Sequence, residues 1–175
     1  LSLEKILKKK GYSTNVGNEG GFAPLLGSNQ EALDLIVEAV EKAGYSMGED
    51  VAIGFDAAAT EFFNAESGKY ELKRDNVSFS TDEMIDWVMD LSKKYPVVSF
   101  EDMLAEDDWA GWTKLVARAG DIQIVGDDLL VTNATRVERA IKEKSATALL
   151  VKVNQIGSLT ETLRAMRTAE DAGWA

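Results

Sequence analysis

Residues Leu149-Leu150-Val151-Lys152-Val153-Asn154-Gln155-Ile156-Gly157 decide the fold class of this chain. The part from Leu149 to Val153 is short, apolar and partly β-branched, which predicts a strand buried on both faces, as in a parallel sheet covered by helices. Its one charged residue is Lys152, and an ammonium group that is buried without a partner is strongly destabilising. We therefore expect Lys152 at the end of this strand, facing a polar site, and we expect its partners at the ends of other strands.

The rest of the chain repeats an alternation of strand signals and helix signals. Ser28, Ser80 and Ser158 each precede a glutamate by three residues, a pattern that predicts helix starts. Strands that alternate with helices of about 10 to 15 residues indicate a parallel α/β sheet, either closed as a barrel or open and doubly wound. The predicted strands cover residues 51–56, 97–101, 122–126 and 148–153. The predicted helices cover residues 3–10, 28–44, 80–94, 108–119, 133–144 and 158–173. A small hairpin is predicted with its turn at residues 67–68.

The composition limits the classes of partner and of chemistry. With 175 residues and 45% hydrophobic content, the chain can bury one sizeable core. Its net charge of −11 argues against a nucleic acid or an anionic membrane as partner, and favours a small molecule or a cation. The chain has no cysteine and no histidine, so a thiolate metal site is excluded and any proton transfer must use a carboxylate, a lysine or a tyrosine.

Charged residues stand at the ends of the four predicted strands. Asp56 and Glu101 end the first two, Asp127 follows the third, and Lys152 lies near the end of the fourth. In parallel α/β folds, ligands bind at the carboxyl edge of the sheet, because the loops there surround a common mouth. Three converging carboxylates repel one another unless a cation holds them, and oxygen ligands without histidine or cysteine favour Mg²⁺ or Mn²⁺. We therefore predict Asp56, Glu101 and Asp127 as metal ligands.

Several of these residues have two interpretations that the sequence leaves open. Asp102 and Asp128 either support the metal ligands or are ordinary acids near helix starts. Lys152 is either a general base, since a neighbouring divalent cation favours its neutral form, or a structural ion-pair partner. Glu19 lies in a glycine-rich turn, where it can project into a pocket or be an ordinary turn residue.

Five motifs follow one another along the chain: GNEGGFAP at residues 17–24, DAAATEF at 56–62, SFED at 99–102, VGDDLLVTN at 125–133 and VKVNQIGS at 151–158. In this order and spacing they resemble enolase, closely and over essentially the whole chain, and most of all its bacterial form. Met103 and Asn18 depart from the residues that are usual in that family. The resemblance implies an α/β fold that is part of a TIM-like, enolase-type barrel, with parallel strands alternating with helices.

The resemblance also implies an activity and roles for single residues. It implies a cytoplasmic lyase of glycolysis that dehydrates 2-phosphoglycerate to phosphoenolpyruvate with Mg²⁺ as cofactor. By matching motif, Asp56, Glu101 and Asp127 would hold the metal. Lys152 would be the base that takes the carbon-bound proton, and Glu19 would be the acid that assists loss of the hydroxyl group.

The resemblance implies that this chain is an incomplete barrel domain. The chain begins at Leu1 without an initiator methionine, and Trp174-Ala175 follow Gly173 as if they began another strand. We therefore expect residues 1–175 to be part of the C-terminal barrel domain of a longer protein, which binds a small phosphorylated substrate and forms a homodimer. We expect the 175 residues alone to be inactive.

Two other functions are compatible with parts of the pattern. A receiver-like signalling module also uses an acidic pair that holds Mg²⁺, another aspartate that accepts phosphate, and a strand-end lysine. The order of residues argues against it, because Asp127-Asp128 follow Asp56 in this chain, whereas the acidic pair comes first in receivers. The second alternative is a non-catalytic enolase-like fragment.

Overall fold

The computed structural model describes residues 1–18 and 20–175, so Glu19, the predicted acid, lies outside the described residues. The contacts within the chain divide it into two compact units, residues 1–52 with 72–77 and residues 53–71 with 78–175. Each unit is described by itself below. None of the helices in the described part of the chain combines the length and the apolar character that are needed to cross a lipid bilayer.

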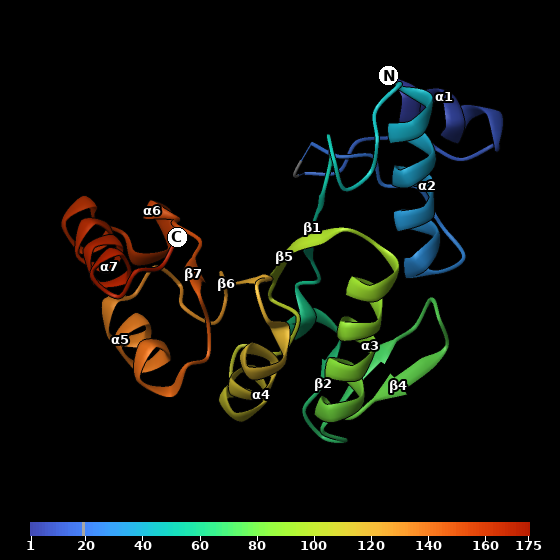
Figure 1. Ribbon diagram of the computed structural model, residues 1–175. Coiled ribbons are helices and arrows are strands. Elements are labelled where there is room, and N and C mark those ends of the chain that lie inside the picture. The colour runs from blue at the N-terminus through green and yellow to red at the C-terminus, as the bar shows by residue number, and fades with distance from the viewer. Residues whose placement is uncertain (19) are drawn as a thin grey trace. The chain divides into compact units, whose positions relative to one another are not determined.

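The first unit is built on two helices, α1 (Ser2–Lys9) and α2 (Asn29–Lys42), which pack against each other (Figure 1). The hydroxyl group of Ser28 accepts the N–H of Glu31, which confirms the helix start that the sequence predicts there. Apolar side chains on one face of each helix form the buried core of this unit, and they are Ile6, Leu7, Leu35 and Ala39.

The second unit is organised by a parallel sheet of four strands in the order β1-β5-β6-β7 (Figure 1). The strands are β1 (Ile53–Asp56), β5 (Val97–Glu101), β6 (Gln123–Gly126) and β7 (Ala148–Leu149). Phe100 and Ile124 pair in register and are fully buried, so the apolar interior lies along the central strands. The parallel α/β fold is as predicted, and over the described residues the sheet is open rather than closed.

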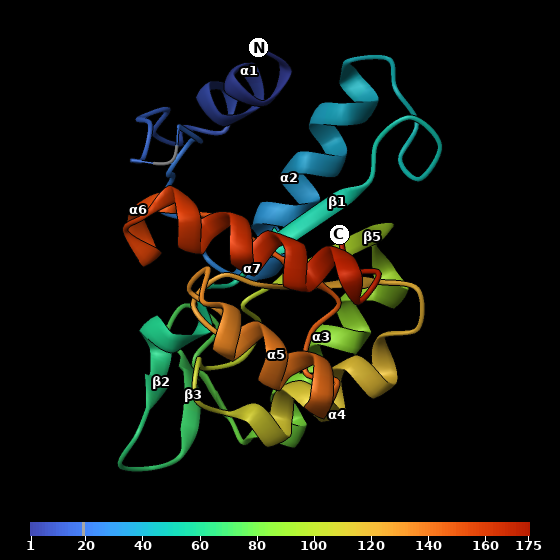
Figure 2. The same cartoon turned by 90° about the vertical axis from the view of Figure 1, so that its left-hand side faces the viewer.

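Four longer helices precede or follow these strands along the chain, and each of the four begins with a side-chain cap. They are α3 (Thr81–Lys94), α4 (Trp109–Ala119), α5 (Ala134–Glu143) and α7 (Leu159–Asp171). The caps are Ser80, Asp108, Asn133 and Ser158, whose side chains accept backbone N–H groups of the first turn. Helices α5 and α7 lie side by side (Figure 2), as do α3 and α4. The predicted alternation of strands and helices is thus confirmed.

The predicted strand over residues 148–153 is wrong in its second half. Strand β7 ends at Leu149, and residues 153–156 form the one-turn helix α6 (Val153–Ile156). The Leu150 N–H still donates to the Gly126 carbonyl at 3.2 Å, but the Gln155 N–H turns to the nearby Lys152 carbonyl at 3.0 Å. Val153, which the strand prediction placed in the interior, is 47% exposed. A run of apolar, β-branched residues does not reveal where sheet pairing stops, because only the neighbouring strand supplies that limit.

The predicted hairpin is present and belongs to a larger sheet. Strands β2 (Phe63–Asn64) and β3 (Lys69–Leu72) are antiparallel, with Phe63 opposite Tyr70. The sequence did not predict the third strand, β4 (Val77–Phe79), or the short 3-10 helix η1 (Ala59–Phe62). The hairpin matters because it carries a fully buried tyrosine, Tyr70, to the loop that follows β5.

The Tyr70 hydroxyl connects the hairpin to that loop by two hydrogen bonds. It donates to Asp108 Oδ2 at 3.0 Å and accepts the N–H of Ala105 at 3.0 Å. Burial raises the pKa of Tyr70, so the phenol stays protonated at neutral pH. A buried polar group with both of its partners stabilises one conformation of the loop.

We predict that Tyr70→Phe lowers the free energy of unfolding by about 1–3 kcal/mol, because the buried N–H of Ala105 loses its acceptor. Denaturant titration of the chain followed by tryptophan fluorescence measures this change. The control is Tyr45→Phe, which removes the hydroxyl from a tyrosine that is 57% exposed. Equal losses in the two variants would show that the buried hydroxyl has no special role.

Candidate active site

The four charged residues singled out in the sequence lie at the carboxyl edge of the parallel sheet. Asp56 and Glu101 are register partners at the ends of β1 and β5. Glu101 also pairs with Val125 of β6, and Asp127 follows this strand directly after its last residue, Gly126. Lys152 comes shortly after β7 and precedes α6. Residues from four strands therefore meet in one region, as the strand-end pattern predicts.

Asp127 has a partner on each of its carboxylate oxygens. Lys152 Nζ contacts Oδ2, and Gln155 Nε2 donates to Oδ1 at 2.8 Å. The Asp127 side chain is 9% exposed, whereas the Lys152 side chain is 42% exposed. Lys152 is therefore an ion-pair partner here, and solvent still reaches its side chain. The sequence interpretation did not include Gln155, and the only available signal was its place in the same motif as Lys152.

Asp102 is a buried carboxylate that joins the ends of β5 and β6. One of its oxygens accepts the N–H of Asp127 at 3.1 Å and the other accepts the N–H of Asp128 at 2.8 Å. Burial raises the pKa of Asp102 to about 6, while these two backbone donors oppose the rise. Asp102 therefore holds the two peptide groups that flank Asp127. This contact favours the first of its two interpretations over that of an ordinary acid near a helix start.

Negative charge is concentrated around Glu101. Burial raises its pKa to about 7, and the carboxylates of Asp56, Asp102 and Asp127 add to the rise, while Lys152 opposes it. Burial also raises the pKa of Asp128, with the Asp127 carboxylate as the next cause. Such crowding of carboxylates is typical of a site that binds a cation or moves a proton.

The residues at this edge suit a hard divalent cation. Asp102, Asp127 and Asp128 each offer an oxygen, and these oxygens lie within 4.8 Å of one another. Only Asp127 belongs both to this group and to the predicted ligand set with Asp56 and Glu101. Both oxygens of Asp102 already accept backbone N–H groups, which accounts for its closeness to the other two. A purely carboxylate donor set fits Mg²⁺ or Mn²⁺ rather than a metal that prefers sulfur or nitrogen.

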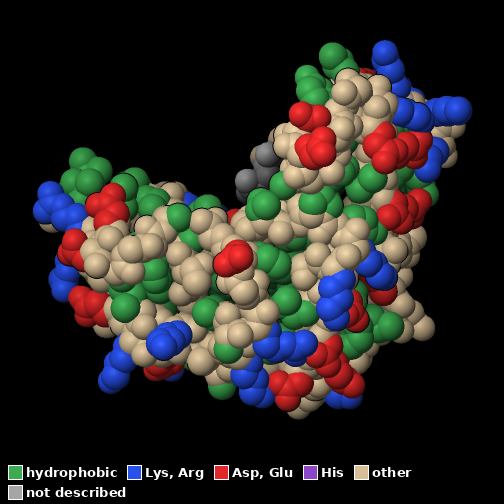
Figure 3. Space-filling model, in the orientation of Figure 1, with side chains coloured by type: hydrophobic (Ala, Val, Ile, Leu, Met, Phe, Trp, Pro, Cys, Tyr) green, Lys and Arg blue, Asp and Glu red, His purple; other side chains and the backbone are tan. Residues whose placement is uncertain are grey.

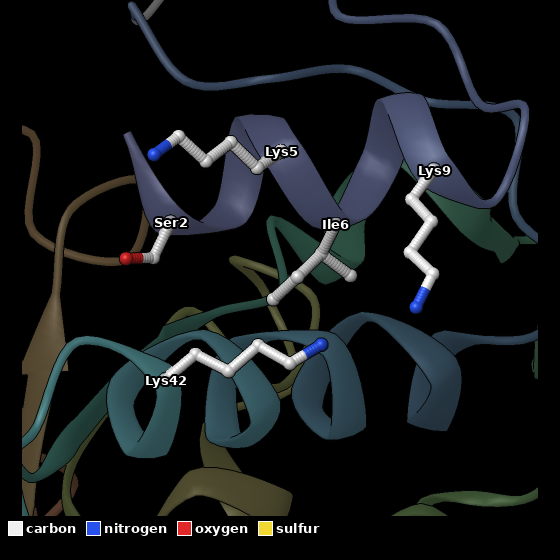
Figure 4. A pocket seen from close by; sticks show the side chains of 5 residues that line it. All are labelled: Ser2, Lys5, Ile6, Lys9 and Lys42. Atoms are coloured by element: carbon white, nitrogen blue, oxygen red, sulfur yellow. The ribbon is translucent and has the colours of Figure 1, made fainter.

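Two hollows on the surface lie away from this edge and are lined by other residues. One is a groove of about 290 Å³ between α1 and α2, lined by Ser2, Lys5, Ile6, Lys9 and Lys42 (Figure 4). The other, of about 350 Å³, lies along α7 and includes one carboxylate, that of Asp171. On the face shown in Figure 3, acidic and basic side chains are interspersed. The edge of the sheet is therefore the better candidate for metal chemistry.

Comparison with protein families finds a match over the whole chain. A family model described as "Enolase, C-terminal TIM barrel domain" matches residues 1–175. The match covers the whole chain and agrees with the parallel α/β fold described above. It also favours the enolase resemblance over the receiver-like alternative.

We predict that the stability difference between the parent chain and Glu101→Gln depends on pH. In the folded chain the Glu101 pKa of about 7 lies above its ordinary value of 4.5, so the folded state binds this proton more tightly than the unfolded state. The resulting stabilisation is present at low pH and is lost as the pH rises through about 7. Glu101→Gln should therefore gain stability relative to the parent between about pH 5 and about pH 8.

Denaturant titrations at several pH values, with divalent metals removed, measure this difference. Adding Mg²⁺ at about pH 8 should reduce the stability advantage of Glu101→Gln over the parent. A cation that binds only the folded parent offsets the repulsion among its ionised carboxylates. A difference that stays constant over the whole pH range would contradict the raised pKa of Glu101.

Proposed function

Because this chain belongs to the enolase family, through its C-terminal TIM barrel domain, we propose that the protein carrying it is a phosphopyruvate hydratase. This lyase dehydrates 2-phosphoglycerate to phosphoenolpyruvate in glycolysis, with Mg²⁺ as cofactor. The observation that carries the proposal is the meeting of Asp56, Glu101, Asp127 and Lys152 at one edge of the sheet. The same proposal includes three further points, which rest on the sequence motifs alone. They are that the protein resembles the bacterial form, lies in the cytoplasm and forms a homodimer.

We assign Asp56, Glu101 and Asp127 as the residues that would hold Mg²⁺. Asp56 and Glu101 are adjacent in register, and the charges of Asp56 and Asp127 both act on Glu101. When bound, the metal would stabilise the additional negative charge that forms on the substrate carboxylate as the neighbouring carbon loses its proton. In this assignment Asp102 is not a ligand but a supporting residue, whose oxygens accept the backbone N–H groups of Asp127 and Asp128.

Lys152 is the proposed base. Its side chain is 42% exposed at the carboxyl edge of the sheet. Because the lysine side chain is flexible, its amino group can turn toward a substrate bound at this edge. In its neutral form Lys152 takes the proton from the carbon next to the substrate carboxylate. Glu19, assigned by its motif alone, gives a proton to the leaving hydroxyl group, which departs as water. One proton is thus accepted and one is donated for each substrate.

We predict that Lys152→Ala lowers the exchange of the carbon-bound proton of 2-phosphoglycerate by about 100- to 10,000-fold, the usual contribution of a positioned base. Mg²⁺ binding should remain largely intact, because Asp56, Glu101 and Asp127 are unchanged. NMR in deuterated buffer measures the exchange, and calorimetry measures Mg²⁺ binding. The control is Lys142→Ala, which removes an exposed lysine from α5. Exchange at the parental rate in Lys152→Ala would show that Lys152 is not the base.

Glu19→Gln should behave differently. We predict that it keeps the exchange of the carbon-bound proton but loses dehydration, because the proposed acid acts only when the hydroxyl group leaves. Exchange is followed by NMR, and phosphoenolpyruvate formation by its ultraviolet absorbance. A variant in which both steps survive would rule out the acid role.

A further inference from the structure

We propose that Thr132 and Gln155 form a positioning pair, which keeps the Asp127 carboxylate and the Lys152 main chain in place while the Lys152 side chain moves. This inference rests on the proposed function for the movement of Lys152 and for the role of Asp127 as a metal ligand. It rests on the geometry of the described residues for everything else. Neither Thr132 nor Gln155 was among the site residues predicted from the sequence.

The first observation is an unusual backbone conformation in the turn after β6. Val131 and Thr132 have φ angles of 44° and 54°, in the left-handed region that β-branched residues rarely adopt. The turn is closed by the Val131 N–H, which donates to the Asp127 carbonyl at 2.7 Å. Strained conformations of this kind persist only where the surroundings hold them, and they cluster at functional sites. The conformation places the Thr132 side chain in the interior, where the residue is fully buried.

The second observation is the set of contacts made by the Thr132 hydroxyl group. It accepts the N–H of Lys152 at 2.8 Å. It lies 3.4 Å from the Leu150 carbonyl and 3.4 Å from Gln155 Oε1, either of which can accept its proton. One buried hydroxyl group therefore joins the chain beyond β7 to the side chain of Gln155.

The third observation is the orientation of the Gln155 amide. Its Nε2 donates to Asp127 Oδ1, and its Oε1 faces the hydroxyl of Thr132. The reverse orientation would place two acceptors, the amide oxygen and the carboxylate, against each other. The amide is therefore held by its hydrogen bond to one oxygen of Asp127, and the Thr132 hydroxyl group lies on its other side as a possible donor.

Two side chains hold the Asp127 carboxylate, and only one of them, Lys152, moves in the proposed reaction. The other, Gln155, stays in place. Lys152 Nζ holds the other oxygen of Asp127, and this contact is given up when the lysine turns toward a substrate. Gln155 then remains on Asp127, while Thr132 still holds the backbone N–H of Lys152. The pair thus keeps a proposed metal ligand oriented through the movement of the proposed base. Such supporting residues affect metal affinity without contacting the metal.

The test uses two pairs of variants of the protein that carries this chain. Gln155→Met keeps side-chain length but removes the amide, and its control is Asn154→Leu, a similar change at the exposed neighbouring residue in α6. Thr132→Val keeps the branched shape but removes the hydroxyl group, and its control is Thr132→Ser, which retains it. The measurements are the Mg²⁺ dissociation constant by calorimetry, the thermal midpoint, and the exchange rate at saturating Mg²⁺.

We expect Gln155→Met to weaken Mg²⁺ binding by about 10- to 100-fold, with Asn154→Leu unchanged. We expect Thr132→Val to lower the exchange rate at saturating Mg²⁺, and Thr132→Ser to restore it. In a Lys152→Ala background the effect of Gln155→Met on Mg²⁺ binding should be larger than in the parent, because the Asp127 carboxylate has then lost its contact with Lys152 and depends more on Gln155. A purely structural role would lower the thermal midpoint and leave the Mg²⁺ dissociation constant unchanged.

Parental Mg²⁺ affinity in Gln155→Met, or equal exchange rates in Thr132→Val and the parent, would overturn the positioning pair. Failure of the proposed function gives a different result. A parent protein that binds Mg²⁺ but catalyses neither exchange nor dehydration would refute the hydratase assignment. Weaker Mg²⁺ binding in Gln155→Met would still support the contact between Gln155 and Asp127 in that case.

Discussion

The candidate site depends on one buried carboxylate, that of Asp102, and on the two N–H groups it accepts. Removing a carboxylate from water is costly, and the hydrogen bonds from Asp127 and Asp128 offset that cost. Because Asp102 directly follows Glu101, these bonds fix the end of β5 against the residues after β6. Lys152 and Gln155 attach in turn to Asp127, so the site is built outward from this link.

The same arrangement creates an electrostatic problem that a cation can solve. Glu101 lies in a partly buried position under the influence of three other carboxylates, and Lys152 offsets only part of their charge. Ionisation of Glu101 is therefore opposed until a positive ligand arrives. The crowding that destabilises the ionised site without a cation would favour a divalent one, because two positive charges offset more of the repulsion, and the oxygen donors would suit a hard cation.

The loop after β5 is held a second time, by hydrogen bonds to Ala105. Tyr70 accepts the N–H of Ala105, and the Trp112 indole donates to the Ala105 carbonyl at 3.0 Å. Trp112 and Tyr70 are both fully buried, so these bonds are shielded from water. Strands β5 and β6 thus supply the apolar interior, and buried polar bonds hold the segments that extend from it. A proposed site on loops can be as well ordered as the sheet when its backbone groups are satisfied in this way.

The sequence by itself determined the alternation of strands and helices, the helix starts at Ser28, Ser80 and Ser158, and the strand-end positions of Asp56 and Glu101. Each of these follows from local chemistry, namely the period of apolar residues and the capping of free N–H groups. Only the tertiary structure decided that β7 stops at Leu149, that Asp102 holds the backbone of Asp127, and that Gln155 lies on the Asp127 carboxylate. These contacts join residues far apart in the chain, and their geometry is set by the register of neighbouring strands and the course of the turns between them, which a hydrophobic pattern does not encode.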